Sequence, residues 1–433
     1  MRPPFRQFEL SLIVLLILAF MVHMTGLAQA VTPLSVPTAM VIEYGVIAIF
    51  GMAALLRGHL LVFFGGLAFV GYLLLQCYVW NQITGFAMNL NAVLSYGTLL
   101  ICIVFYETRI QVETILRIIL GFSIAYLVIY GLFWEVILDI VGRGDKIYLP
   151  SDGTRGPRLY LAAPFATFVF MYAITSFRRN PLLSIPLLVM SGYALFIAQT
   201  RFAMILLGIA FLAAIVGSIA GELRKAANIT LAFLFLTICT FSLAGFLVPN
   251  WNPYLAISGD SSGNARAVQY LDGVTALSGH LWTGLGIAGS TLDVQFFLHP
   301  NRPFFAGDLG IAGVVVLFGL PVTLLFIMIC LNFILRPTRP FGQMGQMAVA
   351  LFYVTQQAAF GSVFNFDLMG GPATLFGSIT LALWLQDAKA NLGRQTVPAQ
   401  AAQFPGATGS DGAAPGLDTD QPGAGPIPDR GEA

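Results

Sequence analysis

Long runs of apolar residues, separated by short polar breaks, follow one another along almost the whole chain. A helix needs about 20 apolar residues to cross the hydrocarbon layer of a membrane. Because a backbone in lipid must satisfy its own hydrogen bonds, runs of this length predict membrane-spanning helices. The pattern predicts twelve spans, at residues 9–29, 37–56, 59–79, 87–106, 115–141, 158–177, 181–199, 202–221, 228–248, 309–335, 345–364 and 370–387.

The charges in the polar breaks predict which side of the membrane each break occupies. If the N-terminus lies inside, every inner connection carries Arg or Lys, as the positive-inside rule requires. These inner residues are Arg2, Arg6, Arg57, Arg109, Arg117, Arg178, Arg179, Arg224, Lys225, Arg336, Arg339, Lys389 and Arg394. We therefore expect both termini in the cytoplasm.

Composition supports the same class of protein. Of the 433 residues, 57% are hydrophobic and 9% are charged, and the mean hydropathy is +0.82. These values exclude a soluble globular protein and indicate an all-α polytopic membrane protein, with the lipid bilayer as its surroundings. The net charge of +1 gives no sign of a nucleic-acid partner. The four cysteines fall inside apolar runs, where we interpret them as small buried hydrophobic residues.

Two regions are expected. Residues 1–391 form a helical membrane domain with one long outer loop at 249–308, and the first apolar run is interpreted as a retained helix, not a cleaved signal peptide. Residues 392–433 are rich in Gly, Ala, Pro, Gln and Asp and almost free of large apolar residues. Such a segment cannot bury a core, so we expect a disordered cytoplasmic tail.

Several cations on the outer side oppose the charge rule. They are Arg143, Lys146, Arg155, Arg158, Arg201, Arg266 and Arg302. Long loops escape the rule, and this accounts for Arg143 and Lys146 without a functional role. Arg201 stands alone between two apolar runs, where a cation is costly unless an anion or carboxylate meets it.

The long outer loop contains two patterned stretches. In NARAVQYLDGVTAL, at 264–277, the apolar residues Ala265, Val268, Leu271 and Val274 recur every three positions. This spacing predicts a short amphipathic helix on the membrane face that displays Arg266. In the following GHLWTGLGIAGS, three of the glycines allow tight turns or a close approach of the backbone to a ligand. These glycines are Gly284, Gly286 and Gly289.

A cluster of polar residues ends the loop, in FFLHPNRPFFAGDLGIAG at 296–313. The stretch contains His299, and a histidine side chain among several loop arginines suits a general base that works beside an anionic substrate. Asp308 has two interpretations: it orients His299 or pairs with Arg302, or it caps the start of the tenth span. His280 is a second candidate for the base.

These stretches together resemble the superfamily of O-antigen ligases and Wzy-type O-antigen (exopolysaccharide) polymerases. Ligases of that family carry a His followed by Asn, Ser or Gln, a Gly eleven residues after the His, and a Gly, Thr or Tyr three further on. His299, Gly310 and Gly313 fit this spacing, whereas Pro300 departs from it. The family also has an Arg at the outer start of a mid-chain span and another in the long outer loop, which Arg201 in QTRFAMI and Arg266 in NARAVQY resemble.

A further loop, GTRGPRLYLAAPFATF, is similar to a Gly-rich segment of many relatives. The likeness covers roughly residues 9–387. It implies a membrane glycosyltransferase with a GT-C-like architecture, located in the bacterial inner membrane with its active site facing the periplasm. The implied donor is a glycan linked to undecaprenyl pyrophosphate, and the implied partners include a flippase and a chain-length regulator.

The resemblance also implies roles for the residues above. Arg201 and Arg266 would hold the pyrophosphate and stabilise the charge that grows on it, because arginine binds phosphate groups bidentately. His299 would accept the proton of the incoming sugar hydroxyl. Arg155, Arg158, Arg302 and Asp308 are candidates for supporting roles, and Arg155 and Arg158 could bind glycan, bind phosphate or only order their loop. With a pyrophosphate leaving group we expect no metal and no cofactor.

Four functions remain open at this point. The leading hypothesis is a polymerase of repeat units for an extracellular polysaccharide or O-antigen. A ligase that transfers glycan to lipid A-core or to a protein is the nearest alternative, and Pro300 favours the polymerase. A transporter or flippase also has about twelve spans, but usually shows repeated halves and interrupted helices. The fourth is a non-enzymatic assembly partner.

Overall fold

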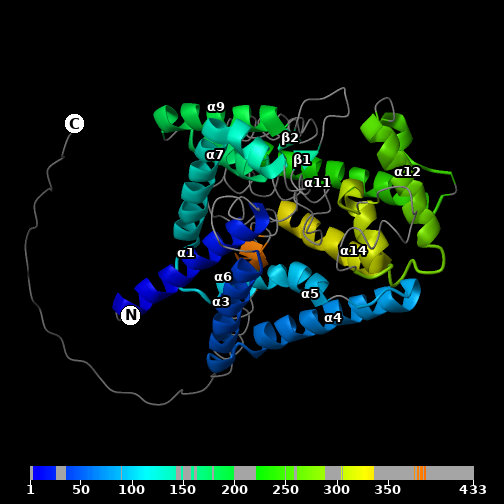
Figure 1. The fold of residues 1–433 in the computed structure, drawn as a ribbon, viewed down its shortest axis with the longest axis horizontal. Coiled ribbons are helices and arrows are strands. Elements are labelled where there is room, and N and C mark those ends of the chain that lie inside the picture. The colour runs from blue at the N-terminus through cyan, green and yellow to red at the C-terminus, as the bar shows by residue number, and fades with distance from the viewer. Residues whose placement is uncertain are drawn as a thin grey trace, which may run out of the picture. The chain divides into compact units, whose positions relative to one another are not determined.

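A computed structural model gives the fold. It describes residues 3–25, 36–88, 90–142, 148–149, 158–159, 163–177, 180–198, 221–248, 250–257, 261–287, 304 and 306–335, together with single positions between 375 and 386. Within these residues the chain is almost entirely helical, with one pair of two-residue strands (Figure 1).

The elements follow one another in this order. The helices before the strands are α1 (Pro3–Thr25), α3 (Val36–Leu56), α4 (Leu60–Thr84), α5 (Leu90–Gly97), the 3-10 turn η1 (Thr98–Leu100), α6 (Ile101–Glu107) and α7 (Val112–Gly142). The strands β1 (Tyr148–Leu149) and β2 (Arg158–Leu159) pair antiparallel. Then come α8 (Ala163–Ser176), α9 (Pro181–Ala198), α11 (Gly221–Leu243), η3 (Ala244–Phe246), η4 (Pro253–Ile257), α12 (Ser261–Ala276), η5 (Ala306–Leu309) and α14 (Ile311–Leu335).

Five helices among the described residues are long and apolar enough to cross a membrane. They cover Thr38–Leu56, Leu60–Thr84, Val112–Phe133, Asn228–Phe246 and Ile311–Asn332. Each coincides with a span predicted from the sequence. The chain is therefore a membrane-embedded helical protein, as the apolar runs predict.

Two predicted spans differ in their details. The span at 87–106 is divided into α5, η1 and α6. The span at 158–177 begins only at Ala163, because Arg158 and Leu159 form strand β2 and Pro164 then occupies the first turn of the helix, where proline is tolerated. The predicted spans at 202–221 and 345–364 lie outside the described residues, as does most of the span at 370–387.

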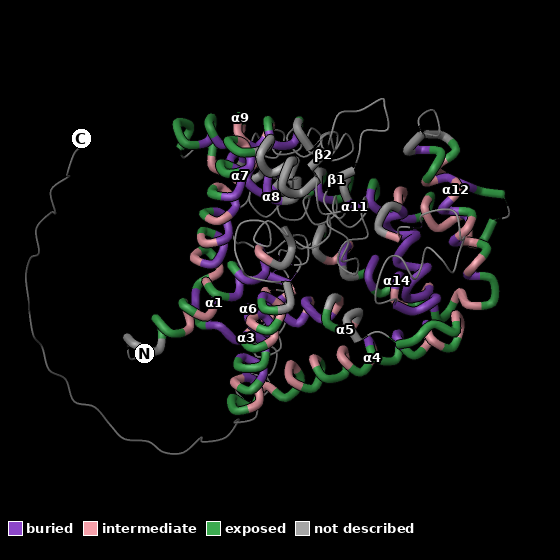
Figure 2. Tube along the Cα trace, in the orientation of Figure 1, coloured by how far each residue is buried: buried purple, intermediate pink, exposed green. Residues whose placement is uncertain are grey.

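Apolar side chains divide between the interior and the outer surface. One large core runs through α1, α3, α6, α7, α8 and α14, with Phe20, Phe105 and Phe165 among its fully buried members. Other large apolar side chains are exposed, such as Leu61 on α4 and Leu182 on α9. Figure 2 shows this as alternating buried and exposed bands along the helices. Exposed apolar surface of this extent is expected where helices face lipid.

The chain divides into two compact units, residues 1–386 and residues 387–433. The described part of the first unit contains every element named above. The second unit lies outside the described residues, so the disordered tail expected at 392–433 stays a prediction.

Candidate functional site

Part of the loop at 249–308, which the sequence predicts on the outer side, folds against the ends of two apolar helices. A second, smaller core joins α12, the C-terminal end of α4 and the first half of α14. We call it the outer-loop core, and its buried residues are Trp80, Tyr270, Leu277, Leu285, Phe304, Leu309, Ala312, Val315 and Val316. Phe304 and Leu309 belong to the polar stretch at 296–313, so the end of that stretch is anchored in this core.

Helix α12 confirms the helix predicted at 264–277. Its stripe of Ala267, Tyr270 and Gly273 packs inward, whereas Ala265 and Leu271 of the predicted apolar stripe are exposed. The sequence pattern identified the helix but not the stripe that packs against the protein. The small residues Ala267 and Gly273 beside Tyr270 allow α12 to pack closely against its neighbours. The regular spacing of larger apolar residues did not predict this face.

Tyr270 fixes α12 to the end of α11. Its hydroxyl donates a hydrogen bond to the Ser242 carbonyl oxygen at 2.7 Å and accepts one from the Gly245 amide at 3.1 Å. Burial raises the pKa of Tyr270 to about 12, and the Gly245 amide bond lowers it only in part. Asn252 adds a second link, since its side-chain amide donates to the Ala267 carbonyl oxygen at 2.8 Å.

Arg266 extends from this anchored helix. Its Nε atom is buried and has no hydrogen-bond partner among the described residues. An unpaired buried donor of a charged group is costly, so an acceptor at this position would stabilise it. Helix α12, which carries Arg266, contacts both α14 and η5, the turn that contains Asp308.

The glycines that match the family spacing shape the turn between η5 and α14. Gly310 has φ of 56°, a left-handed conformation that favours glycine. A Cβ on Gly313 would lie 1.8 Å from the Ala306 carbonyl oxygen. The left-handed backbone favours glycine at 310, and close backbone packing requires glycine at 313, whatever chemistry takes place nearby.

The other predicted site residues are described only in part. Asp308 lies in η5 and Arg158 in β2, and only their backbones are described. His299, Arg201, Arg155 and Arg302 lie outside the described residues. The structure thus shows that the helix carrying Arg266 packs against the turn that contains Asp308, and the roles of all these residues stay predictions.

His280, the second candidate for the base, lies in the turn that follows α12. Its backbone amide donates to the Leu277 carbonyl oxygen at 2.8 Å. Ten residues of helix separate Arg266 from Ala276, which is about 15 Å at 1.5 Å per residue. His280 therefore lies beyond the C-terminal end of α12, whereas Arg266 lies in the N-terminal half of this helix.

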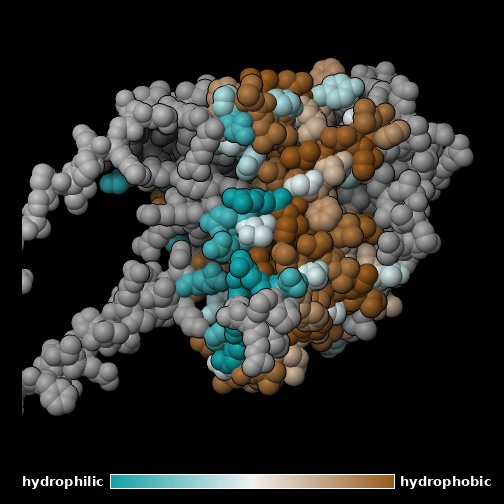
Figure 3. Space-filling model, turned by 90° about the vertical axis from the view of Figure 1, so that its left-hand side faces the viewer, coloured by the Kyte–Doolittle hydropathy of each residue, from teal (hydrophilic) through white to brown (hydrophobic). Residues whose placement is uncertain are grey.

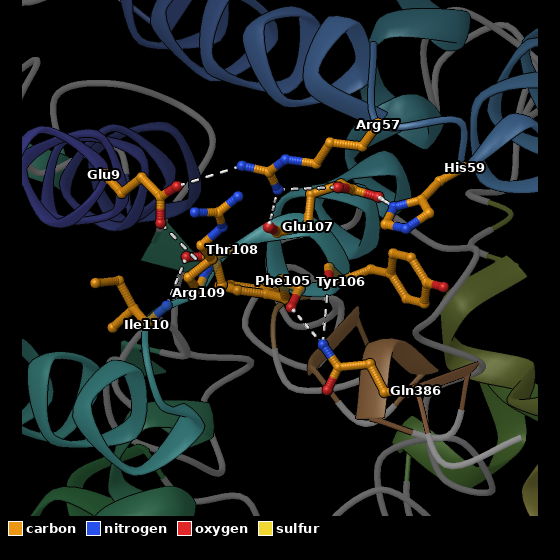
Figure 4. Close-up of polar contacts among 10 residues, drawn as sticks. All are labelled: Glu9, Arg57, His59, Phe105, Tyr106, Glu107, Thr108, Arg109, Ile110 and Gln386. Atoms are coloured by element: carbon orange, nitrogen blue, oxygen red, sulfur yellow. Dashed lines mark hydrogen bonds and ion pairs between the residues drawn. The ribbon is translucent and has the colours of Figure 1, made fainter. Parts of the chain in front are cut away.

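A cluster of charged residues at other helix ends was not predicted. Glu107, whose side chain is fully buried at the end of α6, accepts a hydrogen bond from Arg57 Nη1 at 3.1 Å and contacts His59 Nδ1 at 2.5 Å (Figure 4). Arg57 Nη2 lies 3.5 Å from the Glu9 carboxylate, which also accepts the Arg109 amide at 3.2 Å. We call Glu9, Arg57, His59, Glu107 and Arg109 the inner charge cluster.

The inner charge cluster joins helix ends that the sequence assigns to one side of the membrane. It includes the start of α1, the turn between α3 and α4, and the end of α6. Gln386, at the predicted inner end of the last span, donates to the Tyr106 carbonyl oxygen at 3.0 Å and to that of Phe105 at 3.4 Å (Figure 4). On the face shown in Figure 3, hydrophilic residues gather in a band beside a broad hydrophobic surface. The sequence shows acidic and basic residues at neighbouring span ends, but only the fold shows which of them pair.

Within the described residues, no group of three or more His, Cys, Asp or Glu side chains is arranged to hold a metal ion. Comparisons with known proteins add no further assignment, because no family model, no curated protein and no solved structure matches the chain.

Proposed function

We propose that the protein is a membrane glycosyltransferase that polymerises oligosaccharide repeat units carried on undecaprenyl pyrophosphate. In this proposal it works in the bacterial inner membrane, with its long loop in the periplasm. The proposal rests on the residue pattern of the outer loop and on the helical membrane architecture.

The observation that carries the proposal is the environment of Arg266. A guanidinium group extends from a helix that is fixed by Tyr270 and Asn252, and its buried Nε lacks an acceptor among the described residues. A phosphate oxygen is a suitable acceptor, because charge-assisted bonds between arginine and phosphate are strong and directional. A preorganised donor of this kind stabilises charge that develops on a leaving group.

The proposed reaction is a displacement at the anomeric carbon of the donor sugar. A hydroxyl of the acceptor glycan forms the new C–O bond, and the bond to the pyrophosphate oxygen breaks with its electron pair. His299 takes the proton of the attacking hydroxyl, and Arg266 with Arg201 binds the released undecaprenyl pyrophosphate. Arg155, Arg158, Arg302 and Asp308 remain candidates for supporting roles.

A ligase is the alternative within the same class, since donor and site would be identical and only the acceptor differs. Pro300 departs from the ligase pattern and favours the polymerase.

A transporter is a different class, and one observation bears on it. Helix α14 is interrupted at Gly319, and interrupted helices form the substrate sites of many transporters. Here the carbonyl oxygens of Val316 and Leu317 at the interruption accept backbone amides of the chain itself, which leaves less capacity for an ion or substrate.

The first experiment is His299→Ala in a strain without its native copy, with the amount of protein in the membrane measured and the glycan resolved on a gel. We expect long-chain polymer to disappear and single lipid-linked units to accumulate. Full-length polymer that stays unattached to its final carrier would support the ligase. Normal, normally attached product would overturn the role of His299.

Arg266 provides an independent test. Arg266→Ala removes the proposed phosphate donor and should abolish glycan assembly, whereas Arg266→Lys keeps the charge without the planar fork and should restore only part of it. Asn264→Ala changes an exposed residue on the same helix and is the matched control. Equal glycan assembly in Arg266→Ala and Asn264→Ala would contradict the assignment.

A further inference from the structure

Helix α14 cannot complete its own hydrogen bonds. Gly319 has φ of 79° and ψ of 172°, which interrupts the helix, and Pro321 two residues later has no amide hydrogen. In a regular helix the Leu317 carbonyl oxygen would accept the amide of residue 321. The Leu320 amide instead donates to the Leu281 carbonyl oxygen at 2.8 Å. The carbonyl oxygens of Val316 and Leu317 therefore need donors from elsewhere.

The donors come from residues 281–287 of the long outer loop, which we call the docking segment. The Leu285 amide donates to the Val316 carbonyl oxygen at 2.8 Å, and the Gly286 amide donates to that of Leu317 at 2.9 Å. On its other side, the Ile287 amide approaches the Gln76 carbonyl oxygen of α4 at 3.4 Å. The segment thus lies between α4 and α14 and bonds to both through its backbone.

Only glycine fits at the closest points of this contact. A Cβ on Gly286 would lie 2.3 Å from the Gln76 carbonyl oxygen and 2.6 Å from the Trp80 amide nitrogen. A Cβ on Gly284 would lie 2.4 Å from the Leu317 carbonyl oxygen. The obstructing atoms are all backbone, so no change of side-chain rotamer can relieve the clash. The close approach predicted for these glycines is therefore made to the protein itself.

The contact lies below the predicted outer ends of both helices. Gln76 precedes the end of α4 at Thr84 by eight residues, or about 12 Å, and Leu317 follows the start of α14 at Ile311 by six residues, or about 9 Å. Leu285 and Ile287 are buried at this depth, whereas Ser278 before the segment is exposed. The docking segment therefore enters the helical domain from the outer face.

We propose that the docking segment positions the outer loop for the transfer reaction, with Gly284 and Gly286 as its positioning residues. This inference rests on the proposed function. In the sequence, His299 lies between Ile287 at the end of the docking segment and Phe304 in the outer-loop core, and both of these residues are buried. The described residues that precede and follow the proposed base are thus each packed against the helices.

The donor site has its own attachment, and this allows a specific test. Helix α12 is held to α11 by Tyr270 and to the loop by Asn252, through hydrogen bonds in which the docking segment takes no part. Release of the docking segment should therefore leave binding of the lipid-linked donor unchanged and reduce its turnover. A misplacement of 1 Å in a catalytic group costs about 100-fold in rate, which sets the expected loss.

The first measurement locates the segment and needs no activity. In the full chain in membrane vesicles, Leu285→Cys and Ser278→Cys are each treated with a membrane-impermeant maleimide from the outer side. We expect Cys at 278 to react and Cys at 285 to react about tenfold or more slowly, because the second requires local opening. Equal rates in the two variants would overturn the docking segment, whether or not the protein is an enzyme.

The second measurement adds Gly286→Ala, with Gly279→Ala as the matched control. Both glycines have positive φ, of 85° and 87°, but a Cβ on Gly279 meets nothing within 4 Å. Backbone strain is thus common to both variants, and only Gly286→Ala collides with α4. Each substitution is combined with Leu285→Cys for labelling and is also made alone for kinetics. We expect Gly286→Ala to expose Cys at 285 and to lower the turnover of a lipid-linked donor with KM unchanged. Gly279→Ala should change neither the labelling nor the turnover.

The outcomes separate this inference from the proposed function. Exposure of Cys at 285 with normal turnover, or an equal loss in Gly279→Ala, would overturn the positioning role. A change in KM alone would overturn it too. If the unmodified protein transfers no glycan, the proposed function fails and the positioning role fails with it, while the labelling rates still decide whether the docking segment exists.

Discussion

Glu107 is the residue on which the polar contacts of the inner charge cluster converge. Its carboxylate is fully buried, and each oxygen has a cationic or hydrogen-bonding partner, Arg57 for one and His59 for the other. A buried carboxylate without such partners is costly, so the three residues depend on one another. Glu107 thereby connects the end of α6 to the turn between α3 and α4.

Removing this carboxylate should destabilise the protein. Glu107→Ala removes the carboxylate that His59 contacts and one of the two carboxylates beside Arg57. We expect the free energy of unfolding to fall by about 1 to 3 kcal/mol. Thermal unfolding of the detergent-solubilised protein measures this as a lower midpoint. Glu113→Ala, at an exposed position at the start of α7, is the control. An unchanged midpoint in Glu107→Ala would contradict the importance of the cluster.

Tyr270 predicts a dependence of stability on alkaline pH. Its pKa is raised from 10.0 to about 12, so the folded state favours the neutral phenol. This contribution is fully present below pH 10 and is lost as the pH rises from about 10 to 12, because the unfolded phenol ionises first. Tyr270→Phe should lower the unfolding midpoint at pH 8 and lose less stability than the unmodified protein between pH 10 and 12. Parallel losses over that interval would show that another group is responsible.

At the scale of elements, the start of α14 depends on one close backbone contact. Gly313 lies directly against the Ala306 carbonyl oxygen, so the turn η5 and the first turn of α14 pack without a side chain between them. The Gly313 amide donates to the Gly310 carbonyl oxygen at 3.0 Å and closes the turn. The same turn sets the direction in which the chain leaves the outer-loop core.

We expect Gly313→Ala to disrupt this junction. The added methyl group would lie 1.8 Å from a backbone oxygen, so η5 and α14 must move apart. The amount of folded protein recovered from membranes should fall, and the unfolding midpoint of the remainder should drop. Gly192→Ala, in α9 with nothing within 4 Å of its Cβ, should leave both unchanged. A matching loss in the two variants would contradict the contact.

Sequence patterns predicted elements better than their contacts. The apolar runs located α3, α4, α7, α11 and α14, and the spacing in the outer loop located α12. The stripe of α12 that packs inward was missed, because Tyr270 and Gly273 are buried by partners far away in the sequence. The interruption of α14 was missed as well, although Gly319 and Pro321 were visible, because an apolar window does not show where a helix breaks.

At the scale of the whole molecule, the inner charge cluster joins helix ends for which the sequence predicts the same side of the membrane. The predicted side is the cytoplasmic one. The docking segment contacts α4 and α14 nearer to their other ends. Five spans are described, and the remaining predicted spans stay predictions. The absolute orientation was inferred from Arg and Lys positions, which the fold alone does not encode.

Labelling can establish that orientation. Gln111→Cys follows the inner charge cluster, and Ala87→Cys follows the opposite end of α4; both positions are exposed. An impermeant thiol reagent should label Cys at 87 in cells with a permeable outer membrane, and Cys at 111 only after the inner membrane is opened. The reverse pattern would invert the topology and place the long loop in the cytoplasm.

The interruption of α14 also constrains how the protein is made. The donors that complete this helix lie in residues 281–287, which leave the ribosome before α14 itself. In the proposed orientation they must already have crossed to the outer side when α14 enters the bilayer. A newly inserted α14 therefore has unsatisfied carbonyl groups until the translocated loop packs against it. Folding of the membrane domain is thus completed only after residues 281–287 have crossed the membrane.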